Sequence, residues 1–79
     1  MYDVYHDKEK YRFFIQQADQ ECVLDYVVTG NEINFTHTYV PFRLRGQGLA
    51  EQLVEVGLKW AKEQGYEIKA DCWYVAKFL

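Results

Sequence analysis

The chain has 79 residues, a formal net charge of −3 and 49% hydrophobic residues. A chain of this length builds one small core, so we interpret residues 1–79 as a single domain. The acidic balance and the lack of a basic stripe argue against nucleic-acid binding, and no apolar run approaches the roughly 18–20 residues of a membrane span.

The N-terminal sequence and the cysteines indicate a cellular compartment. Met1-Tyr2-Asp3-Val4 is not a basic region followed by an apolar block, so we expect a cytoplasmic protein without a secretory signal. The two cysteines, Cys22 and Cys72, should then be reduced thiols. Together with the two histidines they do not have metal-ligand spacing, so we predict no metal site.

Three strands are predicted before the middle of the chain, over residues 10–17, 22–29 and 33–40. The dipeptide Gly30-Asn31 suits a two-residue hairpin turn, so these strands should form an antiparallel meander. Regular alternation along the third strand places four side chains on one face, namely Ile33, Phe35, His37 and Tyr39.

A helix is predicted from Gly46 or Gly48 to Gln64, since apolar residues recur there at helical spacing and Gly65 is a natural stop. Gly57 inside the helix costs about 1 kcal/mol relative to Ala, which indicates close packing of the helix on the sheet. A fourth strand is predicted over residues 66–73. A strand–helix–strand crossover makes the last two strands parallel, so the fold class is α+β.

The junction over residues 40–50 carries two arginines and two glycines between a strand and a helix. Unpaired amides and the positive end of the helix dipole suit a phosphate, and glycines let the backbone approach it. The glycine spacing matches neither a Walker loop nor the dinucleotide fingerprint. The alternative interpretation is a glycine-rich helix entry with two solvated arginines.

Three motifs carry a resemblance to a known family. Arg43-x-x-Gly46-x-Gly48 resembles the Arg/Gln-x-x-Gly-x-Gly/Ala motif of the GCN5-related N-acetyltransferases, the GNAT superfamily. The segment 33–79 is similar to the minimal members of that superfamily, called the YjdJ type. Their three motifs are matched in order by His37, Thr38, Val40 and Pro41, then Arg45, Gly46, Gly48 and Leu49, then Cys72, Tyr74 and Val75. Two positions depart from the pattern, where Ala70 and Trp73 replace the usual Pro and Ser.

The resemblance implies a GNAT-like fold in which acetyl-coenzyme A (acetyl-CoA) is the co-substrate. Loop amides would hold its pyrophosphate, and its pantetheine arm would lie between the two parallel strands as they splay apart. The residues expected to bind it are Val40, Arg43, Arg45, Gly46, Gln47, Gly48, Leu49 and Ala50.

The function implied is an acetyl-CoA-dependent N-acetyltransferase acting on an unknown amine or protein acceptor. The alternative is a non-catalytic acyl-CoA-binding or protein-interaction module. We expect a monomer or weak dimer with no nucleic-acid or membrane partner.

Two residues are candidates for catalysis. Cys72 would lie near the thioester end of the ligand, where it either attacks as a nucleophile or only lines the pocket. His37 is the best available base, because histidine titrates near neutral pH, and its alternative is an ordinary strand histidine hydrogen-bonded to a neighbour.

Overall fold

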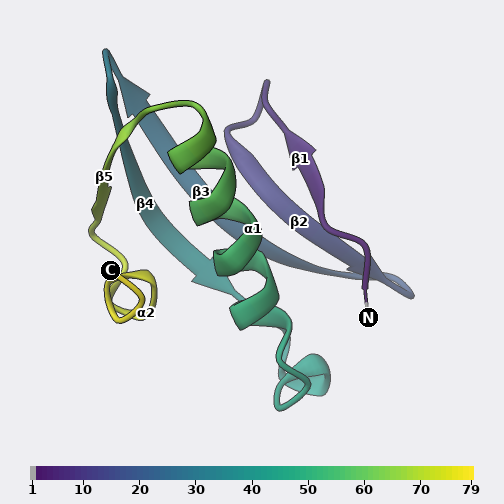
Figure 1. Ribbon diagram of the computed structural model, residues 1–79. Helices are drawn as coiled ribbons and strands as arrows, with labels where there is room; N and C mark the ends of the chain where they lie inside the picture. The colour runs from purple at the N-terminus through teal and green to yellow at the C-terminus, as the bar shows by residue number, and fades with distance from the viewer. Residues whose placement is uncertain (1) are drawn as a thin grey trace.

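A computed structural model describes residues 2–79 of the chain. Figure 1 shows one long helix, α1, lying across one face of a twisted sheet, with a short helix, α2, near the C-terminus. In chain order the elements are β1 (Tyr5–Asp7), β2 (Arg12–Gln17), β3 (Gln20–Thr29), β4 (Glu32–Tyr39), the 3₁₀ turn η1 (Phe42–Leu44), α1 (Leu49–Glu63), β5 (Glu67–Ala70) and α2 (Trp73–Ala76).

The sheet order follows the chain, β1-β2-β3-β4-β5. Strands β1 to β4 are antiparallel neighbours, and β5 pairs with β4 in parallel after the crossover through α1. The predicted α+β fold with a parallel final pair is therefore confirmed. The antiparallel part has one strand more than the three predicted, because β1 adds to the edge of β2. With three residues, β1 is too short for an alternation of apolar and polar residues to predict a strand.

The core lies between α1 and the sheet. Its fully buried side chains come mainly from β2, β3, β4 and α1, and Val75 of α2 adds to them. A Cβ on Gly57 would lie 2.8 Å from Leu24 Cδ2 and 3.2 Å from Phe35 Cε1. Glycine at this position therefore allows the close approach of α1 to the sheet that the sequence predicted.

A β-bulge in β4 changes which face its last residues occupy. Asp25 of β3 pairs with His37 and Tyr26 pairs with Phe35, which leaves Thr36 as an extra residue. Beyond such a residue the alternation is inverted. Phe35 is buried but His37 is exposed, so the predicted common face for the whole strand is wrong after Phe35.

The last strand ends earlier than predicted. Asn34 Nδ2 donates to Asp71 Oδ2 at 3.0 Å, and the Asp71 amide donates to Asn34 Oδ1 at 2.9 Å. The Cys72 amide makes the last link to β4, donating to the Phe35 carbonyl at 3.0 Å, and the chain then turns into α2. The predicted strand over 66–73 is therefore only four residues long, and Cys72 caps a helix instead of lying in a strand.

Candidate functional site

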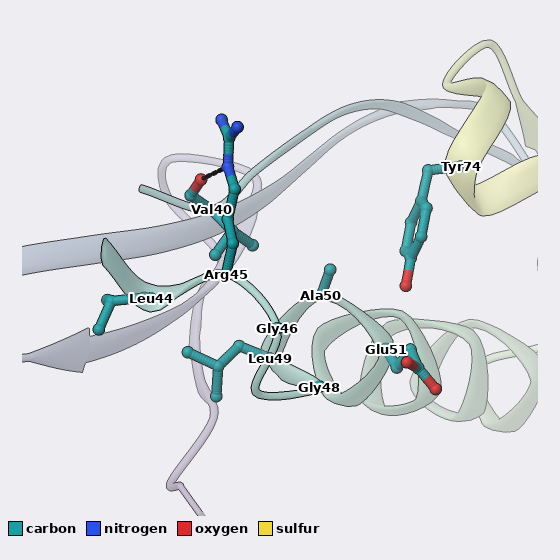
Figure 2. A pocket seen from close by; sticks show the side chains of 9 residues that line it. All are labelled: Val40, Leu44, Arg45, Gly46, Gly48, Leu49, Ala50, Glu51 and Tyr74. Carbon is teal, nitrogen blue, oxygen red and sulfur yellow. Dashed lines mark hydrogen bonds between the residues drawn. The ribbon is translucent and has the colours of Figure 1, made fainter. Parts of the chain in front are cut away.

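The two glycines of the loop adopt a backbone conformation that other residues rarely take. Gly46 and Gly48 have φ angles of +81° and +76°, in the left-handed region that favours glycine. A Cβ on either would meet no protein atom within 4 Å, so the space beside the loop is open. At the start of the loop, Arg45 Nε donates to the Val40 carbonyl at 2.9 Å, as Figure 2 shows.

The first turn of α1 begins directly after this loop. Gly48 is its N-cap and has no side chain to cap the helix, and the first helical hydrogen bond runs from the Gln52 amide to the Gly48 carbonyl at 3.1 Å. The amides of Leu49, Ala50 and Glu51 therefore have no acceptor within the helix. They give this end of α1 the character of an anion-binding site.

Two adjoining cavities extend from this helix end. The first, of about 250 Å³, is drawn in Figure 2 and lies between the loop, the start of α1 and Tyr74. The second, of about 390 Å³, is lined by Cys72, Trp73 and the end of β4. They share four lining residues, Val40, Arg45, Ala50 and Tyr74. We call the two together the α1–α2 groove.

The groove exists because β5 ends while β4 continues to Tyr39. Pairing between them covers only Glu32 to Phe35 on β4, opposite Glu67 to Ala70. Beyond that point the chain turns away into α2, and the last part of β4 has no strand on that side. Thr38, Tyr39 and Val40 line the groove there. The resemblance implied two parallel strands that splay apart; here β5 ends instead, and α2 lies beside the last part of β4 where a diverging strand was expected.

Cys72 lies at the end of the groove away from the loop. Its sulfur is 3.4 Å from Thr38 Oγ1. Partial burial by itself would raise the pKa of the thiol, but the Thr38 hydroxyl and the backbone amides of Val75, Tyr74 and Thr38 together lower it from its usual value. A lower pKa increases the thiolate fraction and hence the reactivity of the sulfur. By contrast, Cys22 is fully buried, and burial raises the pKa of its thiol.

His37 does not meet Cys72 in this site. It follows the bulge, is exposed, and lines neither cavity of the groove. Thr38 contacts Cys72, and neighbouring strand residues point to opposite faces, so His37 points to the open face of the sheet. The role of His37 as a base stays a prediction, with no contact to the thiol that it was expected to activate.

Six of the eight predicted coenzyme-binding residues line the groove, namely Val40, Arg45, Gly46, Gly48, Leu49 and Ala50. Arg43 is exposed and lies outside both cavities. Gln47 lies outside them too, and its side-chain oxygen accepts a hydrogen bond from the Tyr2 hydroxyl at 2.8 Å.

Tyr74 is a groove residue to which the sequence assigned no role. It lines both cavities, and in Figure 2 its hydroxyl points toward the first turn of α1, where Glu51 lies. Burial, with a smaller effect of the Glu51 charge, raises the pKa of its phenol. Tyr74 therefore keeps its proton at neutral pH. Its place in the Cys-x-Tyr-Val motif was the one available signal.

Comparison with known proteins identifies the family. Residues 11–79 match the family described as GCN5-related N-acetyl-transferase. The chain belongs to that family. It is 32% identical over 79 residues to Protein NATD1 of Bos taurus, with 96% of this chain and 70% of the relative covered. Identity to Protein NATD1 of Mus musculus and of Homo sapiens is 30% over the same length, covering 96% of this chain and 72% and 70% of those relatives.

Two kinds of site are absent from residues 2–79, the part of the chain that the structure describes: a metal-binding cluster and a membrane-spanning helix. No group of three or more His, Cys, Asp or Glu side chains in this range is arranged to hold a metal ion. None of the helices in this range is long and apolar enough to cross a membrane.

Proposed function

We propose that this protein is an acetyl-CoA-dependent N-acetyltransferase that binds the coenzyme along the α1–α2 groove. The observation that carries the proposal is the continuity of this groove. One end has the unpaired amides of a helix N-terminus, and the other has a thiol with a lowered pKa. A family that uses acetyl-CoA needs both an anion site and a thioester site, separated by a channel.

The residues of the groove fit the parts of coenzyme A. Its pyrophosphate carries negative charge, which the amides of Leu49 and Ala50 and the guanidinium of Arg45 would attract. The pantetheine arm contains amide groups, which would hydrogen-bond to the backbone of β4 beyond Phe35, where the pairing with β5 ends. Val40 supplies an apolar surface between the two ends.

Acetyl transfer requires a nucleophile and a proton for the departing thiolate. Tyr74 keeps its proton and lines both cavities, but its hydroxyl points toward the first turn of α1, the end proposed for the phosphates, so we assign the proton for the thiolate to solvent and not to Tyr74. Two routes supply the nucleophile. The acceptor amine attacks the acetyl carbon directly, or the Cys72 sulfur takes the acetyl group first and passes it to the amine. The lowered pKa of the Cys72 thiol favours testing the second route.

The activity is tested by measuring free-thiol release from acetyl-CoA in the presence of small primary amines and lysine-containing peptides. We expect release that depends on the amine, with the acetyl group found on the amine by mass spectrometry. Tight binding of acetyl-CoA without amine-dependent release would instead establish the non-catalytic acyl-CoA-binding module. Absence of both binding and release would overturn the proposal.

Variants of the two cysteines distinguish the two routes. In the Cys72 route, the protein gains the mass of one acetyl group on Cys72, and Cys72→Ser abolishes that gain while Cys22→Ala keeps it. Cys22 is the matched control because it is fully buried and lies outside the groove. If Cys72→Ala turns over like the wild type, the thiol only lines the site and the amine attacks directly.

A further inference from the structure

The glycine loop needs support from outside itself. Gly46 and Gly48 both occupy the left-handed region, and neither has a side chain that could pack or hydrogen-bond. Glycine loses more conformational freedom on ordering than any other residue. A loop of this composition holds its amides in place for a ligand only if other residues fix it.

Tyr2 contacts both the glycine loop and the start of α1. Its hydroxyl donates to Oε1 of Gln47, the residue between the two glycines, at 2.8 Å. Its carbonyl accepts a hydrogen bond from Nε2 of Gln52, in the first turn of α1. Tyr2 and Val4 also pack against the core, which anchors this segment. One residue therefore connects the loop, the helix start and the core, across 45 to 50 positions of sequence.

We propose that Tyr2 is a positioning residue that holds the glycine loop in its ligand-binding conformation. Arg45 holds the start of the loop through its bond to Val40, and Tyr2 holds its middle through Gln47. The Gln47 side chain is engaged by the Tyr2 hydroxyl, and in this proposal Gln47 positions the loop without contacting the ligand. The consequence for coenzyme affinity rests on the proposed function, whereas the consequence for loop order does not.

Tyr2→Phe tests this, because it removes the hydroxyl and keeps the ring. Amide hydrogen exchange measured by NMR without ligand should become faster over residues 46–49 and stay unchanged in the middle of α1. Calorimetry with coenzyme A should give a dissociation constant about three- to tenfold higher, as expected for losing one hydrogen bond. Tyr5→Phe is the matched control, since Tyr5 is an exposed tyrosine whose ring stacks on Phe14 of β2.

A double-mutant cycle then checks that the hydroxyl acts through Gln47. In a Gln47→Ala background, Tyr2→Phe should have no further effect on loop exchange. An unchanged exchange rate in Tyr2→Phe would overturn the proposal, and so would an equal increase throughout α1. If the wild type does not bind coenzyme A, the proposed function fails, and the exchange data still decide the role of Tyr2.

Discussion

Gly48→Ala tests whether the left-handed backbone at the start of α1 serves ligand binding. Gly48 has a φ of +76°, and an added Cβ would meet no protein atom within 4 Å. The cost of alanine there is therefore backbone strain and not a clash, about 1–2 kcal/mol. For a domain of this size that loss lowers the melting temperature by roughly 4–8 °C per kcal/mol.

Gly65 is the matched control for this strain. It follows the other end of α1, has a φ of +79°, and also has open space where a Cβ would be. Gly65→Ala should therefore lose about the same stability as Gly48→Ala. Any difference in ligand binding between the two variants then reports the position of the glycine and not the strain alone.

The expected effect on affinity follows from the same strain. A loop that relaxes to relieve about 1–2 kcal/mol must regain it on binding, so the dissociation constant for coenzyme A should rise about 5- to 30-fold. Isothermal titration calorimetry on Gly48→Ala, Gly65→Ala and the wild type measures this. Equal affinities in all three proteins would refute the assignment of this loop to coenzyme binding.

Three further predictions concern charge, pH and packing. Glu51→Gln removes a carboxylate that lines the groove beside the proposed phosphate site, so calorimetry should show coenzyme A binding about two- to fivefold tighter, and an unchanged affinity would place the phosphates elsewhere. Burial lowers the pKa of His6 from 6.5, so the unfolded chain binds its proton at a higher pH than the native state. The free energy of unfolding should then fall as the pH drops below about 6.5. In urea unfolding across this pH range, the free energy of unfolding of His6→Gln should depend less steeply on pH than that of the wild type. Gly57→Ala should fail to stabilise the protein in thermal melts despite the better helix propensity of alanine, because its Cβ would lie 2.8 Å from Leu24; a gain of about 1 kcal/mol would mean that the core repacks at little cost.

The periodic elements could be predicted from sequence because their apolar patterns are long. The helix was expected from Gly46 or Gly48 to Gln64 and runs from Leu49 to Glu63, since many buried positions define its stripe and glycines mark both ends. The hairpin at Gly30-Asn31 was likewise readable, and Gly30 has a φ of +60°. The glycine loop was identified because two glycines and two arginines lie between a predicted strand and a predicted helix.

The missed features depend on contacts between distant residues. The alternation of residue types along β4 does not reveal the bulge at Thr36, so His37 was assigned to the wrong face of the sheet. The early end of β5 depends on the two hydrogen bonds between Asn34 and Asp71, which lie 37 residues apart. These two features decide the surroundings of Cys72, and neither has a local signal in the sequence.

The central claim is that coenzyme A binds along the α1–α2 groove with its phosphates at the start of α1. The most direct test is an NMR titration of amide shifts in the ¹⁵N-labelled protein with coenzyme A. We expect saturable shifts that cluster at the glycine loop and the first turn of α1, along residues 36–40 at and just beyond the end of β4, and at Cys72. Saturable shifts confined to another surface, or no saturation at all, would contradict it.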